Sequence, residues 1–269
     1  LISRMANIQH LLDTQPEPRY TLKKIGEIAE ANKKEAYVVG GVVRNLFLDR
    51  KLNEIDIMVI GDGIEFAKLL AKEMGVKKVI PFPKFSTAHI PTQPIPIEVA
   101  AAREETYEAN SRKPNKVVYT DLTGDLVRRD FTVNAMAMSL IPKEFGELHD
   151  PHNGVRDLMA KQLVTPLNPD ETFSEDPLRM MRAAHFAASL DFHIEEKCYE
   201  SMQRQAERIQ IVSQERITSE FTKILSASKP SVGLIILQKV GLMKHIFPEI
   251  HTMYGIDQTG EWNHKDIFY

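Results

Sequence analysis

The sequence predicts an α+β protein in two parts: a mixed β-sheet with flanking helices over residues 20–168, and an all-helical domain over residues 169–269. Short apolar segments bounded by glycine or proline, which are typical of strands, recur in the first part and are scarce in the second. Helical periodicity dominates after Pro169. Because neither part contains an internal repeat or a low-complexity tract, we expect two ordinary folded domains.

The first domain alternates predicted helices and strands. The prolines of "TQPEPRY" (14–20) end an early helical segment, and a helix is predicted over 20–32. A short strand over 36–40, a turn at Gly40 and Gly41, and a helix over 42–48 follow. The alternation in "EIDIMVIG" predicts a strand over 54–61, followed by a helix over 63–74. Strands are also predicted in "KKVIPF", "TAHIPT" and "IPIEVAAAR", where prolines restrict them to short or edge strands.

Helices are predicted for most of the remaining chain. The segment "LVRRDFTVNAMAMSL" (126–140) predicts a helix that begins near Phe131, with Asp130 as its N-cap. With Pro177 at the first helical position, Asp176 becomes the N-cap of a second helix. The helices predicted for the second domain cover 176–189, 195–209 and 213–225, with shorter ones around 230–240 and 241–247.

Composition excludes several classes of protein. The 269 residues carry a net charge of −3, so a polyanion must be bound by local groups rather than by an overall basic surface. The single cysteine, Cys198, excludes an intrachain disulfide and a cysteine-rich zinc site, and it fits a reducing, cytoplasmic setting. We expect no membrane span, since no apolar run approaches 18 residues, and no signal peptide.

Two groups of residues in the first half suit phosphate and metal chemistry. "GGVVR" places a glycine turn before a helix, where backbone N–H groups and Arg44 can hold a phosphate, although an ordinary tight turn explains the glycines equally well. Glu54 and Asp56 share one face of a predicted strand, and Glu98 lies in the middle of another. Carboxylates brought together in this way suit Mg²⁺, while an exposed edge strand is the alternative.

Two further groups follow. Arg128 and Arg129 stand just before Asp130, where they can meet a phosphate or a ribose or remain solvated. Asp176 and Arg179 lie three residues apart at a helix start, where they form either a structural ion pair or a surface that reads the edge of a base. The residues alone do not decide between these alternatives.

The order and spacing of these segments resemble the class II tRNA nucleotidyltransferases, a family of CCA-adding enzymes and bacterial poly(A) polymerases. The resemblance runs from about residue 22 to the end of the chain. Its most specific motifs are the fourth and sixth of the following series: "VVGGVVRN…EIDI", "IEVAAAR", "SRKP", "DLVRRDFTVNAMA", "DPHNGVRDL", "FSEDPLRMMRAAHFAASLDFHIE" and "VSQERITSEFTKIL".

The resemblance implies a nucleotidyltransferase head, an all-α neck and the start of a helical body that is truncated at Tyr269. It implies that Glu54 and Asp56 bind two Mg²⁺ ions, with Mn²⁺ as an alternative, and that Glu98 joins them as a catalytic acid. Glu215 and Arg216 lie in the next helical motif and support the residues that read the base. The nucleotide-binding positions it implies are Gly40, Gly41, Arg44, Arg128, Arg129, Asp130, Asn134, Asp176, Arg179 and Arg182.

Three positions depart from the family pattern. Asn45 and Glu54 stand where the family has aspartate, and His185 stands near a usual arginine. Since glutamate is one methylene longer than aspartate and Mg²⁺ demands near-octahedral geometry, Glu54 predicts slower catalysis or an altered metal preference.

The resemblance also implies an activity: template-independent transfer of CMP and AMP from CTP and ATP to the 3′ end of tRNA. A poly(A) polymerase, an enzyme that adds only A or only CC, and a catalytically weakened RNA- or nucleotide-binding homologue are the alternatives. The sequence leaves the oligomeric state undetermined.

Overall fold

The structure, a computed structural model, describes residues 6–107 and 114–255. The chain divides into two compact units: the first holds Leu1–Thr106 and Lys116–Leu158, and the second holds the remaining residues. The change of character predicted at 168–169 lies close to this division, on its C-terminal side.

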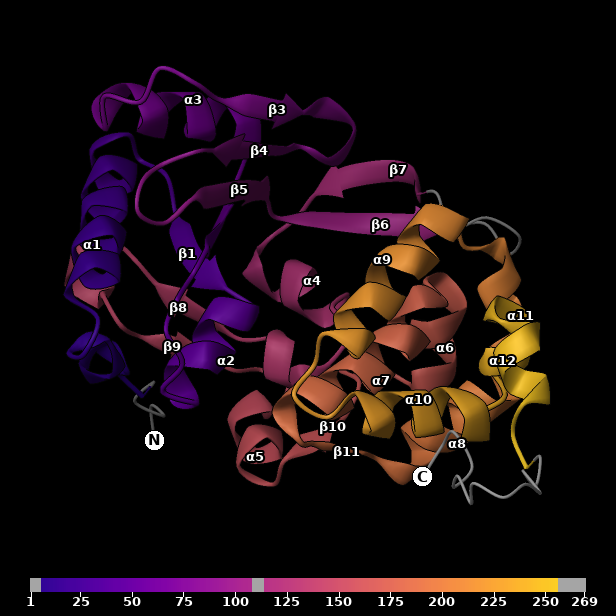
Figure 1. The fold of residues 1–269 in the computed structure, drawn as a ribbon. Helices are drawn as coiled ribbons and strands as arrows, with labels where there is room; N and C mark the ends of the chain where they lie inside the picture. Colours follow the sequence, from indigo (N-terminus) through magenta and orange to yellow (C-terminus); the bar gives the residue numbers. More distant parts are fainter. Residues whose placement is uncertain (1–5, 108–113, 256–269) are drawn as a thin grey trace. The chain divides into compact units, whose positions relative to one another are not determined.

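A mixed seven-stranded sheet forms the centre of the first unit, in the order β3-β4-β5-β2-β1-β8-β9 (Figure 1). β2 and β5 are parallel, and the other neighbouring strands are antiparallel. Strands β6 (Arg103–Tyr107) and β7 (Pro114–Tyr119) pair separately. The seven strands are β1 (Ala36–Val39), β2 (Ile55–Val59), β3 (Ile80–Phe82), β4 (Thr87–Ile90), β5 (Ile97–Ala101), β8 (Ala137–Ser139) and β9 (Leu148–His149).

Prolines stand at or just before the start of two elements of the first unit. Helix α1 (Pro16–Ala31) begins four residues before the predicted start at 20, because Pro16 and Pro18 lie in its first turn, where a missing N–H is harmless. Strand β5 lies in the interior of the sheet, between β4 and β2, so of the two predicted alternatives, a short strand or an edge strand, it is a short one of 5 residues. Pro94 and Pro96 precede the strand and remove no donor from its ladder.

Three helices of the first unit pack close to the sheet. α1 contacts β1 through a buried stripe that includes Leu22 and Ile25. α2 (Gly41–Phe47) follows β1 and contacts both β1 and β2. α3 (Gly63–Glu73) packs on β2, β4 and β5, and its N-cap Asp62 accepts hydrogen bonds from Ile64 N and Glu65 N. The order β1, α2, β2, α3 therefore agrees with the sequence prediction to within one or two residues.

The segment 126–140 contradicts the helix predicted there. Helix α4 (Leu122–Val127) ends before Asp130, a single 3₁₀ turn covers Thr132–Asn134, and β8 follows. Asp130 caps no α-helix; its carboxylate accepts hydrogen bonds from Phe131 N and Asn134 Nδ2. Pairing of β8 with β1 in the sheet outweighs the helical preference of an alanine- and methionine-rich sequence.

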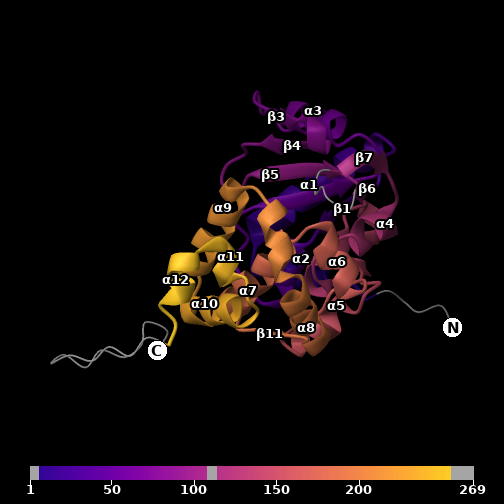
Figure 2. The ribbon, with the colours of Figure 1, turned by 90° about the vertical axis from the view of Figure 1, so that its right-hand side faces the viewer.

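The second unit is mostly helical, as predicted (Figure 2). Its centre is α7, which packs against α6, α9 and α10 and is buried along most of its length. A short parallel pair joins β10 (Gln162–Leu163) to β11 (His193–Ile194). The helices are α6 (Pro169–Glu175), α7 (Leu178–Leu190), α8 (Glu196–Gln205), α9 (Gln214–Leu225), α10 (Pro230–Lys239), α11 (Met243–Ile246) and α12 (Pro248–Thr252), while α5 (Gly154–Met159) lies at the division between the units.

None of the helices found among the described residues has the length and apolar character needed to cross a membrane.

Candidate active site

Three carboxylates approach one another where β2 and β5 run side by side. Asp56 lies directly opposite Glu98 in the parallel register, so the two side chains share one face of the sheet. Glu54 immediately precedes β2, two residues before Asp56. The neighbours Ile55 and Ile57 point to the opposite face, where they are fully buried.

The proximity of these acids shifts the pKa of Asp56. Burial of its carboxyl group, together with the charges of Glu54 and Glu98, raises this pKa from 3.8 to about 7. The cationic side chains of Arg129 and Arg44 act in the opposite direction and lower it. The structure thus brings three predicted acids and two predicted arginines into one electrostatic neighbourhood, all within the first unit.

The donor set at this position suits a hard divalent cation. Carboxylate oxygens are the ligands that Mg²⁺ prefers, and a cation would offset the repulsion that raises the pKa of Asp56. Among the residues that the structure describes, no three His, Cys, Asp or Glu side chains converge closely enough to hold a metal by themselves. In many Mg²⁺ sites, one or two carboxylates bind the ion, and water and substrate phosphates fill the remaining coordination positions.

The glycine turn predicted to hold a phosphate lies beside the acids. Gly40 adopts a positive φ of 66°, and a Cβ atom there would lie 2.8 Å from Nη1 of Arg129. Any larger residue would therefore strain the backbone and displace this guanidinium group. Gly41 is close to Arg44 in the same way, since a Cβ atom would lie 3.3 Å from its Nη2. Both glycines allow arginines to approach the turn.

A chain of hydrogen bonds links α2 to the segment after α4. Arg44 donates through Nη1 to Asn134 Oδ1 at 2.6 Å, and Asn134 donates through Nδ2 to Asp130 Oδ1 at 3.0 Å. Arg44 also donates to Oδ1 of Asn45 at 3.0 Å. Asn134, which was expected to contact a nucleotide, therefore orients Arg44. The buried side chains of Asp130 and Asn134 are hydrogen-bonded to each other.

Asp125 is a site residue that the sequence analysis missed. Only 1% of it is exposed, and it accepts hydrogen bonds from both Arg128 and Arg129, the latter at 2.8 Å. Burial raises the pKa of its carboxyl group, but the two guanidinium groups outweigh this effect and hold the pKa below its ordinary value. The spacing of three and four residues within one helical segment is the signal that could have found it.

The second unit contains the other predicted nucleotide-binding residues. Arg216 donates through Nη2 to Asp176 Oδ2 at 2.8 Å, and Asp176 accepts from Leu178 N at 3.2 Å. Asp176 therefore bonds to the first turn of α7, although Pro177, and not Asp176, is the N-cap residue. Arg179 is 9% exposed and donates to Thr172 O and Glu175 Oε2, both at 3.1 Å. The ion pair of Asp176 with Arg216 therefore links the segment just before α7 to helix α9.

Other contacts join these two helices farther along. His185 and the buried Glu220 lie 2.8 Å apart, and Lys223 donates to Glu220 at 3.1 Å. The guanidinium group of Arg182 lies over the ring of Phe186, with 5.1 Å between its carbon and the ring centroid. His185, at the position that departs from the family pattern, thus has an acidic partner.

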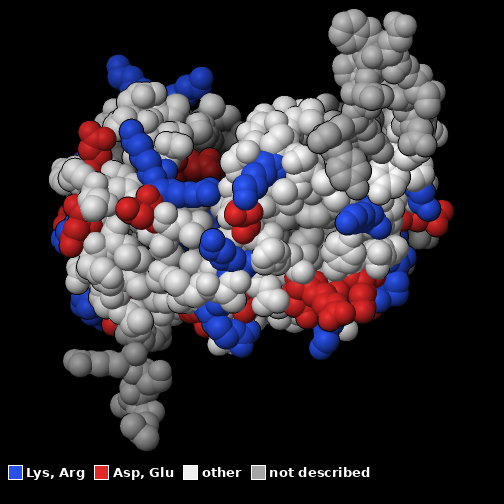
Figure 3. Space-filling view, turned by 60° about the horizontal axis from the view of Figure 1, so that its bottom comes forward, with Lys and Arg blue, Asp and Glu red and all other residues white. Residues whose placement is uncertain are grey.

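Most of the motif "SRKP" (111–114) lies beyond the described residues. On the face drawn in Figure 3, basic and acidic side chains are interspersed, and neither sign covers the whole face. This face therefore carries no continuous basic surface.

Comparison with known proteins identifies two regions of the chain. Residues 36–164 match the family model "Poly A polymerase head domain", and residues 191–254 match "Probable RNA and SrmB- binding site of polymerase A". The chain is 36% identical over 230 residues to an A-adding tRNA nucleotidyltransferase of Aquifex aeolicus, which covers 86% of this chain and 26% of that protein. It is also 36% identical over 228 residues to a CCA-adding enzyme of Bacillus cytotoxicus, covering 83% of this chain and 55% of that protein.

A solved structure resembles the fold. It is a tRNA nucleotidyltransferase complexed with a primer tRNA and an incoming ATP analogue, and it superposes with a TM-score of 0.73 at 32% identity, covering 85% of this chain and 66% of that chain. The chain spans about half, or less, of the length of the two curated relatives. With both domain matches and these relatives in agreement, the chain belongs to the family of class II tRNA nucleotidyltransferases and bacterial poly(A) polymerases.

Proposed function

We propose that this chain carries the catalytic head of an RNA nucleotidyltransferase that adds CMP and AMP, from CTP and ATP, to the 3′ end of tRNA. The observation that supports this most is the position of Asp56 between two other carboxylates and two arginines, which matches the chemistry of phosphoryl transfer. The solved relative that carries a primer tRNA and an ATP analogue supports the same reaction.

In the proposed reaction, the 3′-hydroxyl oxygen of the RNA bonds to the α-phosphorus of the nucleotide, and the bond to the β-phosphate oxygen breaks. The hydroxyl proton leaves to solvent, and pyrophosphate is released. Mg²⁺ held by Glu54 and Asp56 would supply charge neutralisation at the phosphates and a more acidic hydroxyl. Arg44 and Arg129, which are close enough to lower the pKa of Asp56, would contact the triphosphate.

Residues in the second unit would select the base. The carboxylate of Asp176 can accept from the exocyclic amine that cytosine and adenine share, and Arg179 can donate to a ring nitrogen or carbonyl. The ion pair of Arg216 with Asp176 and the two hydrogen bonds of Arg179 would hold these groups in fixed directions.

The test is extension of tRNA that lacks its CCA end by the 269-residue chain, with each nucleoside triphosphate supplied singly and in pairs with Mg²⁺. Growth by C, C and then A is the expected result, and a long A tail or no growth would overturn the proposal. Addition of A alone to tRNA that already ends in CC is the second candidate, favoured by the A-adding relative. An acceptor ending in CC that grows while one lacking all three nucleotides does not would establish it.

A further inference from the structure

The loop between α2 and β2 connects two groups of the candidate site. It begins after Arg44 and the rest of α2 and ends at Glu54, so its path sets the position of this acid relative to the glycine turn. Most of its residues have no regular secondary structure, and Asp49 has a positive φ of 49°. A loop of this kind needs partners from elsewhere in the fold to keep one conformation.

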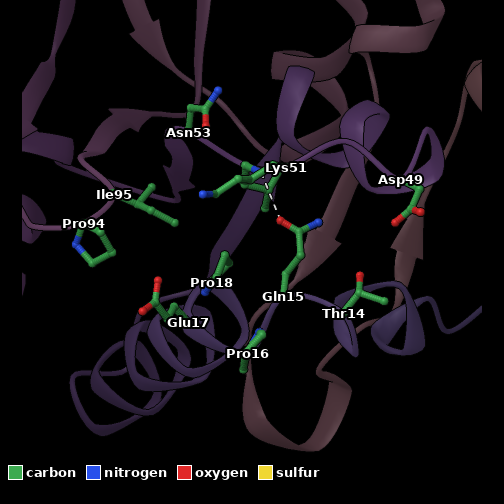
Figure 4. Close-up of a pocket in the computed structure, with 11 residues that line it drawn as sticks. Thr14, Gln15, Pro16, Glu17, Pro18, Asp49, Lys51, Asn53, Pro94 and Ile95 are labelled. Carbon is green, nitrogen blue, oxygen red and sulfur yellow. Dashed lines mark hydrogen bonds between the residues drawn. The ribbon is translucent and has the colours of Figure 1, made fainter.

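Gln15 supplies these partners through its side chain (Figure 4). Its Oε1 accepts a hydrogen bond from Leu52 N at 3.0 Å, and its Nε2 donates to Arg50 O at 3.2 Å. Leu52 is 1% exposed, so water cannot easily replace the partner of its backbone N–H. The carboxamide thus pairs with two backbone groups of the loop, as a neighbouring strand would.

Gln15 is itself held firmly. It is the N-cap residue of α1, where its backbone N donates to Leu12 O at 3.0 Å and its carbonyl accepts from Arg19 N at 3.0 Å. Pro16 restricts the backbone immediately after it. The hydrogen bonds of Gln15 therefore tie the loop to the start of a long helix that packs on the sheet.

Gln15 lines a pocket of about 640 Å³ together with Glu17, Lys51, Asn53 and Pro94. Space of this size leaves room for the loop to move when the carboxamide is removed. Since Leu52 stands two residues before Glu54, a shift at Leu52 is carried to the acid over less than about 7 Å of chain.

We propose that Gln15 is a positioning residue that fixes Glu54, and with it the metal-binding acids, through Arg50 and Leu52. This inference rests on the proposed function for its activity readout. Displacement of a reacting group by about 1 Å can lower a rate about 100-fold. Gln15→Met, which keeps the shape and loses both hydrogen bonds, is therefore expected to lower kcat by about 10- to 100-fold. The KM for the nucleotide, which depends on Arg44 and the glycine turn, should change less than about threefold.

A second variant separates positioning from folding. Gln15→Glu keeps the acceptor for Leu52 N but can donate to Arg50 O only when its carboxyl group is protonated. Near neutral pH, where this carboxyl group is ionised, its kcat should lie between those of the wild type and Gln15→Met. Thr14→Val is the matched control, since Thr14 lines the same pocket and has no hydrogen bond to the loop; its kcat should stay within about twofold of the wild type.

The experiment measures kcat and KM of the four proteins on tRNA lacking CCA, and the increase in unfolding temperature caused by Mg²⁺. If both Gln15 variants keep a wild-type kcat per folded molecule, or if Thr14→Val falls equally, the inference is wrong. If the wild type transfers no nucleotide, the proposed function fails. The inference about Gln15 is then tested by the increase in unfolding temperature that Mg²⁺ causes. Gln15→Met should then lose most of the wild-type stabilisation, and an unchanged value would overturn the inference.

Discussion

Replacement of Asp56 by asparagine should have two effects: it should make the protein more stable in the absence of metal, and it should abolish activity in the presence of Mg²⁺. Asp56→Asn removes one negative charge from the three carboxylates and keeps the size of the side chain. In the absence of a cation this charge is unfavourable, since burial, Glu54 and Glu98 together raise the pKa of Asp56 from 3.8 to about 7. Without this charge, the variant avoids the lowered free energy of unfolding that the wild type shows above neutral pH.

The size and pH range of the effect follow from this pKa. A tenfold change in proton affinity corresponds to about 1.4 kcal/mol, so the rise from 3.8 to about 7 amounts to about 4 kcal/mol at most. Between these two values the folded state binds more protons than the unfolded state, so the free energy of unfolding of the wild type decreases as the pH rises. The gain of Asp56→Asn should be absent near pH 4 and complete near pH 8.

Thermal unfolding in EDTA between pH 4.5 and 8.5 measures this difference. At roughly 2–4 °C per kcal/mol for a domain of this size, Asp56→Asn should unfold up to about 16 °C higher at pH 8 and close to the wild type at pH 4.5. Added Mg²⁺ should raise the unfolding temperature of the wild type much more than that of the variant. Equal stability at pH 8 in EDTA, or a difference that does not change with pH, would refute the electrostatic reasoning.

Three other substitutions test the remaining parts of the site. Glu54→Asp shortens the acid by one methylene and should raise kcat with Mg²⁺ by up to about tenfold; an unchanged rate would show that the longer acid is tolerated. Asp125→Asn leaves two guanidinium groups without their buried anion, and denaturant unfolding should show a loss of roughly 3 kcal/mol together with a lower kcat. Arg216→Met frees Asp176, and the preference for CTP over UTP should fall about tenfold in single-nucleotide assays; intact selectivity would remove Arg216 from the account.

Local patterns predicted the parts of the fold in which neighbouring residues decide the structure. The strand at 36–39, the turn at Gly40 and Gly41 and the helix after it were recognised because apolar residues, glycines and helix formers follow one another directly. The helix predicted for 126–140 was wrong because the alanines and methionines of this segment favour a helix locally. In the fold, Ala137–Ser139 instead pairs with β1 in the sheet.

The candidate site was predicted where a motif shows in the sequence and was missed where a contact depends on the fold. Glu54, Asp56 and Glu98 could be chosen from alternation, yet only the parallel register of β2 and β5 places Asp56 beside Glu98. Asp125 was overlooked because an acid on a short helix resembles a solvated residue until its burial is known. The carboxamide of Gln15 reaches the backbone of residues 35 and 37 positions away, a contact that no local pattern indicates.

Transfer of labelled nucleotide from CTP and ATP to tRNA lacking CCA, compared between the wild type and Asp56→Asn, tests the central claim most directly. The account predicts incorporation by the wild type in Mg²⁺ and a loss of at least about 1,000-fold in the variant, which stays folded and is the more stable protein in EDTA. Absence of incorporation by the wild type, or equal rates for the two proteins, would contradict it.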